Sequence, residues 1–370
     1  MMYHYLFLYK ILIPSVLALL IGFFITPILT HYFYRYRLWK RKPITESQKK
    51  RDGEVWEMSE EFKQIYNKKE ISTPRVGGII VWLIVVITVV SVLFVGLLKG
   101  AENSFSQYFF HIVTRNQTLI PFASLLLGAF FGLIDDLLQI FSKSEHFLNG
   151  GIPRKVRIFI VAFLGAVEGI WFYEKLGFHQ LTIPLLNIHI ELGWFFILFY
   201  IIVMLGLFSS AVIDGIDGLA GGVFAIIFAT YGIIGIIQNQ WSIASFSFLV
   251  MSALFVFLWF NIPPARFYLG ETGILALVLS LSSLIFLTHT VFEFLIIGLP
   301  LILTSLSVII QIIARRVFHK KVFRVAPLHH HFEHLGWSRE RITMRYWMFT
   351  VFTSLIGLII VVMKNLPHIS

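Results

Sequence analysis

Ten runs of apolar residues, each long enough to cross a lipid bilayer as a helix, constrain this chain more than any other feature. A hydrocarbon core about 30 Å thick needs about 20 apolar residues in a helix. Only 14% of the 370 residues are charged, whereas about 25% is usual in a soluble domain. The sequence predicts an all-α polytopic membrane protein, a single integral-membrane domain over residues 1–370, with about ten transmembrane helices near 9–30, 78–98, 117–134, 157–174, 193–212, 219–238, 242–260, 273–291, 294–314 and 346–363.

Basic residues concentrate in alternate connections between these runs. Together, 25 of the 30 lysines and arginines lie in the set 31–77, 135–157, 213–218, 261–272 and 315–345. By the positive-inside rule this side is cytoplasmic, and an even number of spans makes both termini extracytoplasmic. The same rule explains the net charge of +10. We therefore predict contact with the lipid bilayer and no nucleic-acid partner.

Two connecting segments have patterns of their own. Residues 181–192 contain β-branched residues in partial alternation, which predicts a short extracytoplasmic β-hairpin. Residues 55–66 carry an apolar stripe at helical spacing among charged residues, which fits either an interfacial helix or a solvated one.

Acidic residues stand where apolar runs end on the predicted cytoplasmic side. Asp135 and Asp136 end the third run, and a charged carboxylate inside a span costs about 2.5–3.5 kcal/mol, so function is favoured over a solvated margin. Asp214 and Asp217 are three residues apart and face the same way on a helical turn, where an N-cap role explains only one of them. Glu271 follows in a loop shaped by proline and glycine.

These five carboxylates need a positive partner if they converge. Each close pair would repel by roughly 4 kcal/mol at an effective dielectric of about 20. The chain has no cysteine, so an oxygen-rich site points to Mg²⁺ or Mn²⁺, which commonly share their ligand shell with substrate phosphates.

Two further polar stretches flank the apolar runs. Thr73 and Arg75 precede the second run, beside a glycine pair that permits close backbone approach. Three consecutive histidines, His329, His330 and His331, suit contacts to phosphate or acidic groups. A solvated loop and a histidine-rich metal site are the alternatives for this triplet.

Four stretches of the chain resemble the polyprenyl-phosphate N-acetylhexosamine-1-phosphate transferase superfamily, glycosyltransferase family 4. They are residues 73–78, 135–136, 214–220 and 260–273. Within it, the stretch 326–333, Ala-Pro-Leu-His-His-His-Phe-Glu, looks like the phospho-N-acetylmuramoyl-pentapeptide transferase branch. The resemblance covers nearly the whole chain, in order.

The resemblance implies transfer of phospho-N-acetylmuramoyl-pentapeptide from UDP-MurNAc-pentapeptide to undecaprenyl phosphate with Mg²⁺, in the bacterial inner (plasma) membrane, with a cytoplasmic active site. It implies a catalytic set and a substrate-binding set. The first consists of Asp135 or Asp136 as base, with Asp214 and His330. The second consists of Thr73, Arg75, Asp217, Tyr268, His329 and His331, with Tyr268 stacking on uracil. Glu271, together with Asp214, falls at the metal position. A homodimer is left open.

Four positions depart from the usual pattern of the family. Ala211 replaces Asn, Gln139 replaces Lys and Glu271 replaces Asp, while Arg75 is more typical of relatives that transfer N-acetylglucosamine 1-phosphate. A divergent member is predicted. The alternatives are a UDP-N-acetylglucosamine donor, a catalytically inactive lipid-binding relative, and a membrane transporter. Transporters commonly place such carboxylates near mid-membrane on broken helices, not at span ends.

Overall fold

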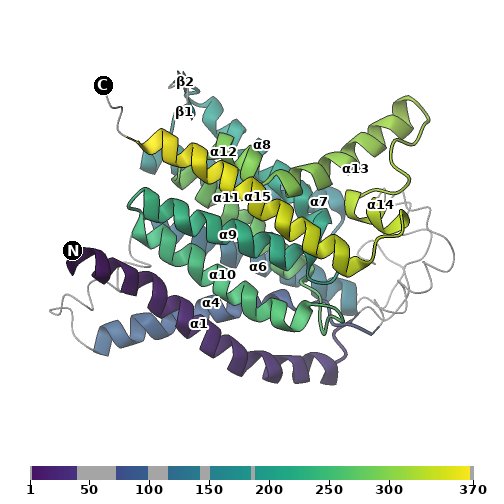
Figure 1. Ribbon diagram of the computed structural model, residues 1–370, viewed down its shortest axis with the longest axis horizontal. Helices are drawn as coiled ribbons and strands as arrows, with labels where there is room; N and C mark the ends of the chain where they lie inside the picture. Colours follow the sequence, from purple (N-terminus) through teal and green to yellow (C-terminus); the bar gives the residue numbers. More distant parts are fainter. Residues whose placement is uncertain (1, 40–71, 99–115, 142–150, 185–187, 367–370) are drawn as a thin grey trace.

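The computed structural model describes residues 2–39, 72–98, 116–141, 151–184 and 188–366, which form a bundle of long helices (Figure 1). Ten helical segments are long and apolar enough to cross a membrane, which confirms the predicted architecture. In the described residues the helices are α1 (Met2–Arg35), α4 (Gly78–Leu98), α6 (Asn116–Phe141), α7 (Arg154–Leu176), α8 (Phe195–Ser209), α9 (Leu219–Ile237), α10 (Trp241–Asn261), α11 (Gly270–Leu287), α12 (Val291–Ile297), α13 (Leu299–Val317), α14 (Leu328–His334) and α15 (Arg339–Asn365), with a short 3₁₀ helix, η1 (Ser210–Ile213).

The predicted hairpin is confirmed. Strands β1 (Gln180–Ile183) and β2 (Ile188–Glu191) pair antiparallel, with Gln180 opposite Glu191 and Ile183 opposite Ile188. The predicted stripe at 55–66 lies outside the described residues.

Helix α11 is the central element, and 94% of it is buried. In a bilayer, helices associate closely where small residues let their backbones approach. Gly128 and Gly132 of α6 provide this, because a Cβ atom at Gly128 would overlap the carbonyl of Leu275 and one at Gly132 would overlap that of Glu271. The two glycines are four residues apart on one face of α6, and the next turn of that helix carries Asp135 and Asp136. Close packing of α6 on α11 therefore brings these aspartates to the start of α11.

Two boundaries differ from the prediction. Helix α6 continues through Asp135 and Asp136 to Phe141 instead of ending before them. The carboxylate of Asp136 has hydrogen-bond partners on α11, so it does not need to be exposed to water. The predicted span 294–314 is divided at Gly298 into α12 and α13, and in Figure 1 α13 diverges from α15 towards one end of the molecule.

The start of α1 and the end of α15 lie at the left of Figure 1, whereas α14 and the start of α15 lie towards the right. This agrees with an even number of spans. The assignment of the right-hand end to the cytoplasm stays a prediction from charge.

A buried carboxylate joins four helices inside the apolar bundle. Glu168 of α7 accepts hydrogen bonds from Ser124 of α6 (2.7 Å), Tyr200 of α8 (2.6 Å) and Ser283 of α11 (2.9 Å). Each hydroxyl group thereby offsets part of the cost of burying a polar group in hydrocarbon. The network fixes the positions of α6 and α11 relative to each other, and these two helices carry Asp135, Asp136 and Glu271.

Candidate active site

Backbone hydrogen bonds join two segments that are distant in the chain, the one before α4 and the one before α11. The amide of Tyr268 donates to the carbonyl of Pro74 (2.8 Å), and the amides of Gly77 and Gly78 donate to the carbonyls of Tyr268 (2.9 Å) and Leu269 (2.8 Å). A Cβ atom at Gly78 would overlap the backbone of Gly273, so glycine is required for this approach. The pairing holds the segment 73–78 against the start of α11.

Asp136, on the neighbouring helix α6, caps the N-terminus of α11. Its Oδ1 accepts from the amide of Glu271 (3.1 Å), and its Oδ2 accepts from the amide of Thr272 (2.9 Å) and from the hydroxyl of Thr272 (2.6 Å). The first amides of a helix have no partner within it and attract negative charge. Asp136 thus holds α11 and, with it, the position of Glu271.

Asp135 lies on the adjoining side, within a cluster of one cation and two carboxylates. Nη1 of Arg157 is 2.6 Å from Oε1 of Glu271 and 3.5 Å from Oδ2 of Asp135. Asp135 also accepts from the Ile152 amide and from Nε2 of Gln139 (3.1 Å). The remaining oxygen of Glu271, Oε2, is buried and has no hydrogen-bond partner.

Asp214 approaches the same point from the loop between η1 and α9. Its Oδ2 accepts from the amide of Gly270 at 3.3 Å. A Cβ atom at Gly270, whose φ is +68°, would lie 2.7 Å from Oδ2 of Asp136. Burial raises the pKa of Asp214 to about 6, although the Arg75 guanidinium acts in the opposite direction. Three carboxylates therefore converge around Gly270: Asp136, Asp214 and Glu271.

Asp217 has a different position, beside the loop that follows α10. Its Oδ2 accepts from the amide of Ala265 (3.2 Å), and its carbonyl accepts from the hydroxyl of Thr343 (3.2 Å). Asn261 fastens the two loops together, because it accepts from the Gly218 amide (2.9 Å) and donates to the Phe267 carbonyl (2.7 Å).

Two buried imidazoles lie against the Asp214 loop. A Cβ atom at Gly215 would be 2.5 Å from Nε2 of His329 and 2.9 Å from Nε2 of His330. Burial and, less strongly, the imidazole of His330 lower the pKa of His329 well below its ordinary value. Both ring nitrogens of His329 lack a hydrogen-bond partner, which leaves a neutral donor and acceptor for a ligand. His331 instead contacts the Phe323 ring, with centroids 5.7 Å apart.

A carboxylate orients the second imidazole. Glu333 is 2.9 Å from Nδ1 of His330 through Oε2 and accepts from Nε of Arg339 (2.6 Å) through Oε1. Burial alone would raise the pKa of Glu333, but the hydrogen bonds from His330 and Arg339 outweigh it, and the pKa is lowered. The ionised carboxylate thus holds Nδ1 and leaves Nε2 facing Gly215.

The orienting role of Glu333 gives a testable expectation. Glu333→Gln removes the charge from both of its hydrogen bonds, and a bond to a charged group contributes about 1.5–3 kcal/mol. If that amount is lost from transition-state binding, turnover falls roughly 10- to 100-fold. We expect this loss in kcat together with a lower unfolding temperature, because the same two hydrogen bonds stabilise the fold. Glu340→Gln, at an exposed position on α15, is the matched control. Equal turnover in the two variants would contradict the role.

The residues around Gly270 fit a hard divalent cation in part. Among the described residues, no group of three or more His, Asp or Glu side chains could hold a metal ion by itself. Mg²⁺ is commonly bound by one or two carboxylates together with substrate phosphates and water. The buried, unpartnered Oε2 of Glu271 and the nearby carboxylate of Asp214 match that smaller donor set.

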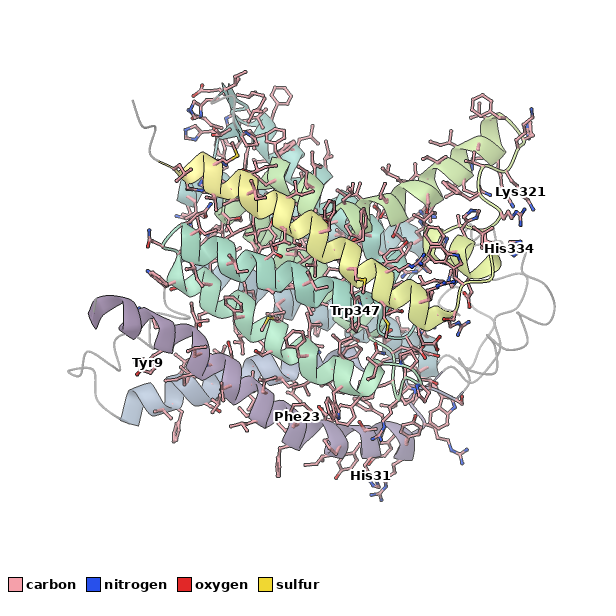
Figure 2. The ribbon with its side chains drawn as sticks, in the orientation of Figure 1. Tyr9, Phe23, His31, Lys321, His334 and Trp347 are labelled. Atoms are coloured by element: carbon pink, nitrogen blue, oxygen red, sulfur yellow. The ribbon has the colours of Figure 1, made fainter. Side chains whose placement is uncertain are left out.

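The structure brings most of the predicted site residues to one end of the bundle. Asp135, Asp136, Asp214, Glu271 and Arg75 lie around the start of α11, and His329 and His330 lie against Gly215. Thr73 is buried at the beginning of the paired segment, and Tyr268 contributes its backbone to that pairing. Figure 2 shows Lys321 and His334 at the same end, with Trp347 nearer the centre on α15.

Sequence reasoning missed four residues of the site: Arg157, Thr272, Asn261 and Arg339. Arg157, Thr272 and Asn261 act through partners distant in the chain, whereas Arg339 acts through Glu333, six residues away. Arg157 gave a signal of its own, because it stands at the edge of an apolar run, and Asn261 and Thr272 fall within the 260–273 stretch named above.

This fold and site define a class: a multi-pass membrane protein with acidic and imidazole groups gathered at one end of an otherwise apolar bundle. The model of glycosyl transferase family 4 matches residues 118–289. The chain is 35% identical to a phospho-N-acetylmuramoyl-pentapeptide-transferase of Latilactobacillus sakei, over 92% of this chain and 97% of that one. It is 32% identical to proteins of the same name from Geobacillus, over 93% and 97% of the two chains, and from Listeria monocytogenes, over 80% and 86%.

The chain belongs to the phospho-N-acetylmuramoyl-pentapeptide-transferase family. It is a membrane transferase, and an identity of 31–35% agrees with the divergent member that the sequence predicts.

Proposed function

We propose that this protein transfers phospho-N-acetylmuramoyl-pentapeptide from UDP-MurNAc-pentapeptide to undecaprenyl phosphate, giving lipid I and UMP, on the cytoplasmic side of the bacterial inner (plasma) membrane with Mg²⁺ as cofactor. The observation that carries the proposal is the convergence of Asp136, Asp214 and Glu271 around Gly270, beside His329 and His330.

The place of the site suits one lipid and one water-soluble substrate. The acceptor has a hydrocarbon chain that stays in the bilayer, whereas the nucleotide donor approaches from water. Reaction occurs where the two media meet, and the acidic residues lie at the ends of α6 and α11. An acceptor phosphate oxygen attacks the sugar-bearing phosphorus of the donor, the bond from that phosphorus to the bridging oxygen breaks, and UMP leaves with that oxygen.

Phosphoryl transfer depends mainly on positioning and charge neutralisation. Mg²⁺, held by Glu271 and Asp214, would neutralise charge on the donor pyrophosphate. We take Asp135 as the base, because the three hydrogen bonds of Asp136 hold the start of α11. Among the described residues, Asp135 accepts only from Gln139 and the Ile152 amide, beside Arg157. His329 is neutral and offers hydrogen bonds to phosphate without adding charge.

UMP release tests the proposal. Purified protein in detergent receives undecaprenyl phosphate, Mg²⁺ and either UDP-MurNAc-pentapeptide or UDP-N-acetylglucosamine. We expect turnover with the first donor only, because the 326–333 stretch is the feature specific to that branch. Turnover with only the second donor would contradict the assignment, and no turnover with either would favour an inactive relative.

A further inference from the structure

The guanidinium of Arg157 lies on one oxygen of Glu271, the carboxylate whose other oxygen the function above gives to a metal ion. Its Nη1 lies 2.6 Å from Oε1 of Glu271 and 3.5 Å from Oδ2 of Asp135, so one positive group holds together two carboxylates from different helices. Two like charges this close repel strongly when partly buried. Arg157 compensates that repulsion through its contacts with both carboxylates.

The burial of these groups makes the compensation necessary. The side chains of Arg157 and Glu271 are 19% and 20% exposed, and that of Asp135 is fully buried. Screening by water and salt is weak at such positions. A divalent cation that binds Glu271 therefore meets a carboxylate whose charge is already neutralised.

The length of the Glu271 side chain contributes to this arrangement. Asp136 fixes the backbone at Glu271 through its amide, so the reach of the side chain determines whether it meets Arg157. An aspartate at this position would withdraw the carboxylate by about one carbon–carbon bond, roughly 1.5 Å, and would break the 2.6 Å contact.

We infer that Arg157 is a built-in counter-ion that competes with the divalent cation for Glu271. The inference rests on the proposed function, because it takes Glu271 as the metal ligand. A cation on the unpartnered Oε2 shares the carboxylate of Glu271 with Arg157 on Oε1, so metal binding brings two positive groups onto one carboxylate and the affinity for the metal alone is set low. Removing the charge of Arg157 leaves the whole negative charge of Glu271 to a bound cation.

Metal binding without substrates tests the inference. Mn²⁺ is titrated into the purified, substrate-free protein in detergent, and free Mn²⁺ is followed by its electron paramagnetic resonance signal. We expect Arg157→Gln to bind Mn²⁺ about tenfold or more tightly than the unmodified protein. Arg154→Gln removes the same charge from an exposed position on α7 and should leave the affinity unchanged.

A second variant covers the case in which Arg157→Gln does not fold. Arg157→Lys keeps the charge on a shorter group that cannot reach both carboxylates in the same way. Its Mn²⁺ affinity should lie between those of the unmodified protein and Arg157→Gln. Equal or weaker binding in both Arg157 variants would overturn the competition.

The outcomes separate this inference from the proposed function. If Mn²⁺ binds neither the unmodified protein nor any variant, while Mg²⁺ still supports UMP release, the counter-ion role is wrong and the transferase assignment stands. Tighter binding in Arg157→Gln without UMP release from the unmodified protein would support the counter-ion and contradict the assigned reaction.

Discussion

Replacing Glu271 by glutamine is expected to abolish turnover. The change keeps the shape of the side chain but removes its charge, and with it the ion pair to Arg157 and the proposed metal ligand. An uncharged amide is a poor ligand for Mg²⁺ beside a guanidinium. We expect a loss of at least about 1000-fold, or roughly 4 kcal/mol in the activation free energy, measured as UMP release at saturating Mg²⁺.

Glu271→Asp is the informative companion. It keeps the charge but shortens the side chain, and Mg²⁺ requires near-ideal octahedral geometry at about 2.0–2.1 Å. We therefore expect this variant to be impaired or merely tolerated. Full activity of Glu271→Gln would show that Glu271 is not the metal ligand, and a large gain in Glu271→Asp would identify the native chain as a weakened catalyst.

The arrangement of spans was predictable because it depends on local composition. Each apolar run must satisfy its backbone within itself in lipid, so the length of the run alone indicates a helix. The hairpin was predictable for a similar reason, since its strand pattern is local. The division of the ninth span at Gly298 was missed because a glycine in an apolar run does not say whether the helix continues.

The candidate site was predictable as a set of residues and not as a set of contacts. Carboxylates at the ends of apolar runs are costly and therefore conspicuous. The partner of each carboxylate depends on how the helices pack. Here the packing depends on Gly128 and Gly132 of α6, and nothing in the neighbouring sequence indicates that these glycines lie against α11. The sequence consequently treated Asp135 and Asp136 alike, although the structure gives them different surroundings.

That difference leads to the second large effect. Asp136→Asn replaces an acceptor that holds two amides and a hydroxyl of α11 with a group that presents two donors and one acceptor oxygen. At least one hydrogen bond to a charged group is lost, worth about 1.5–3 kcal/mol, and a buried amide is left without a partner. Turnover and thermal stability in detergent should therefore fall together, turnover by about 100-fold or more.

Asp135→Asn is the matched comparison, because the two residues are adjacent and both fully buried. Asp135 contacts Arg157, Gln139 and the Ile152 amide just before α7, and these contacts do not involve the amides of α11. If Asp135 is the base, its asparagine variant loses turnover while its unfolding temperature stays nearer to that of the unmodified protein. Near-normal turnover in both variants would show that the pair is structural and that the acceptor phosphate needs no base from it. If only Asp136→Asn lost turnover and its stability stayed unchanged, the two roles would be reversed. Asp136 would then be the base, because its hydrogen bonds to α11 would not be needed for stability.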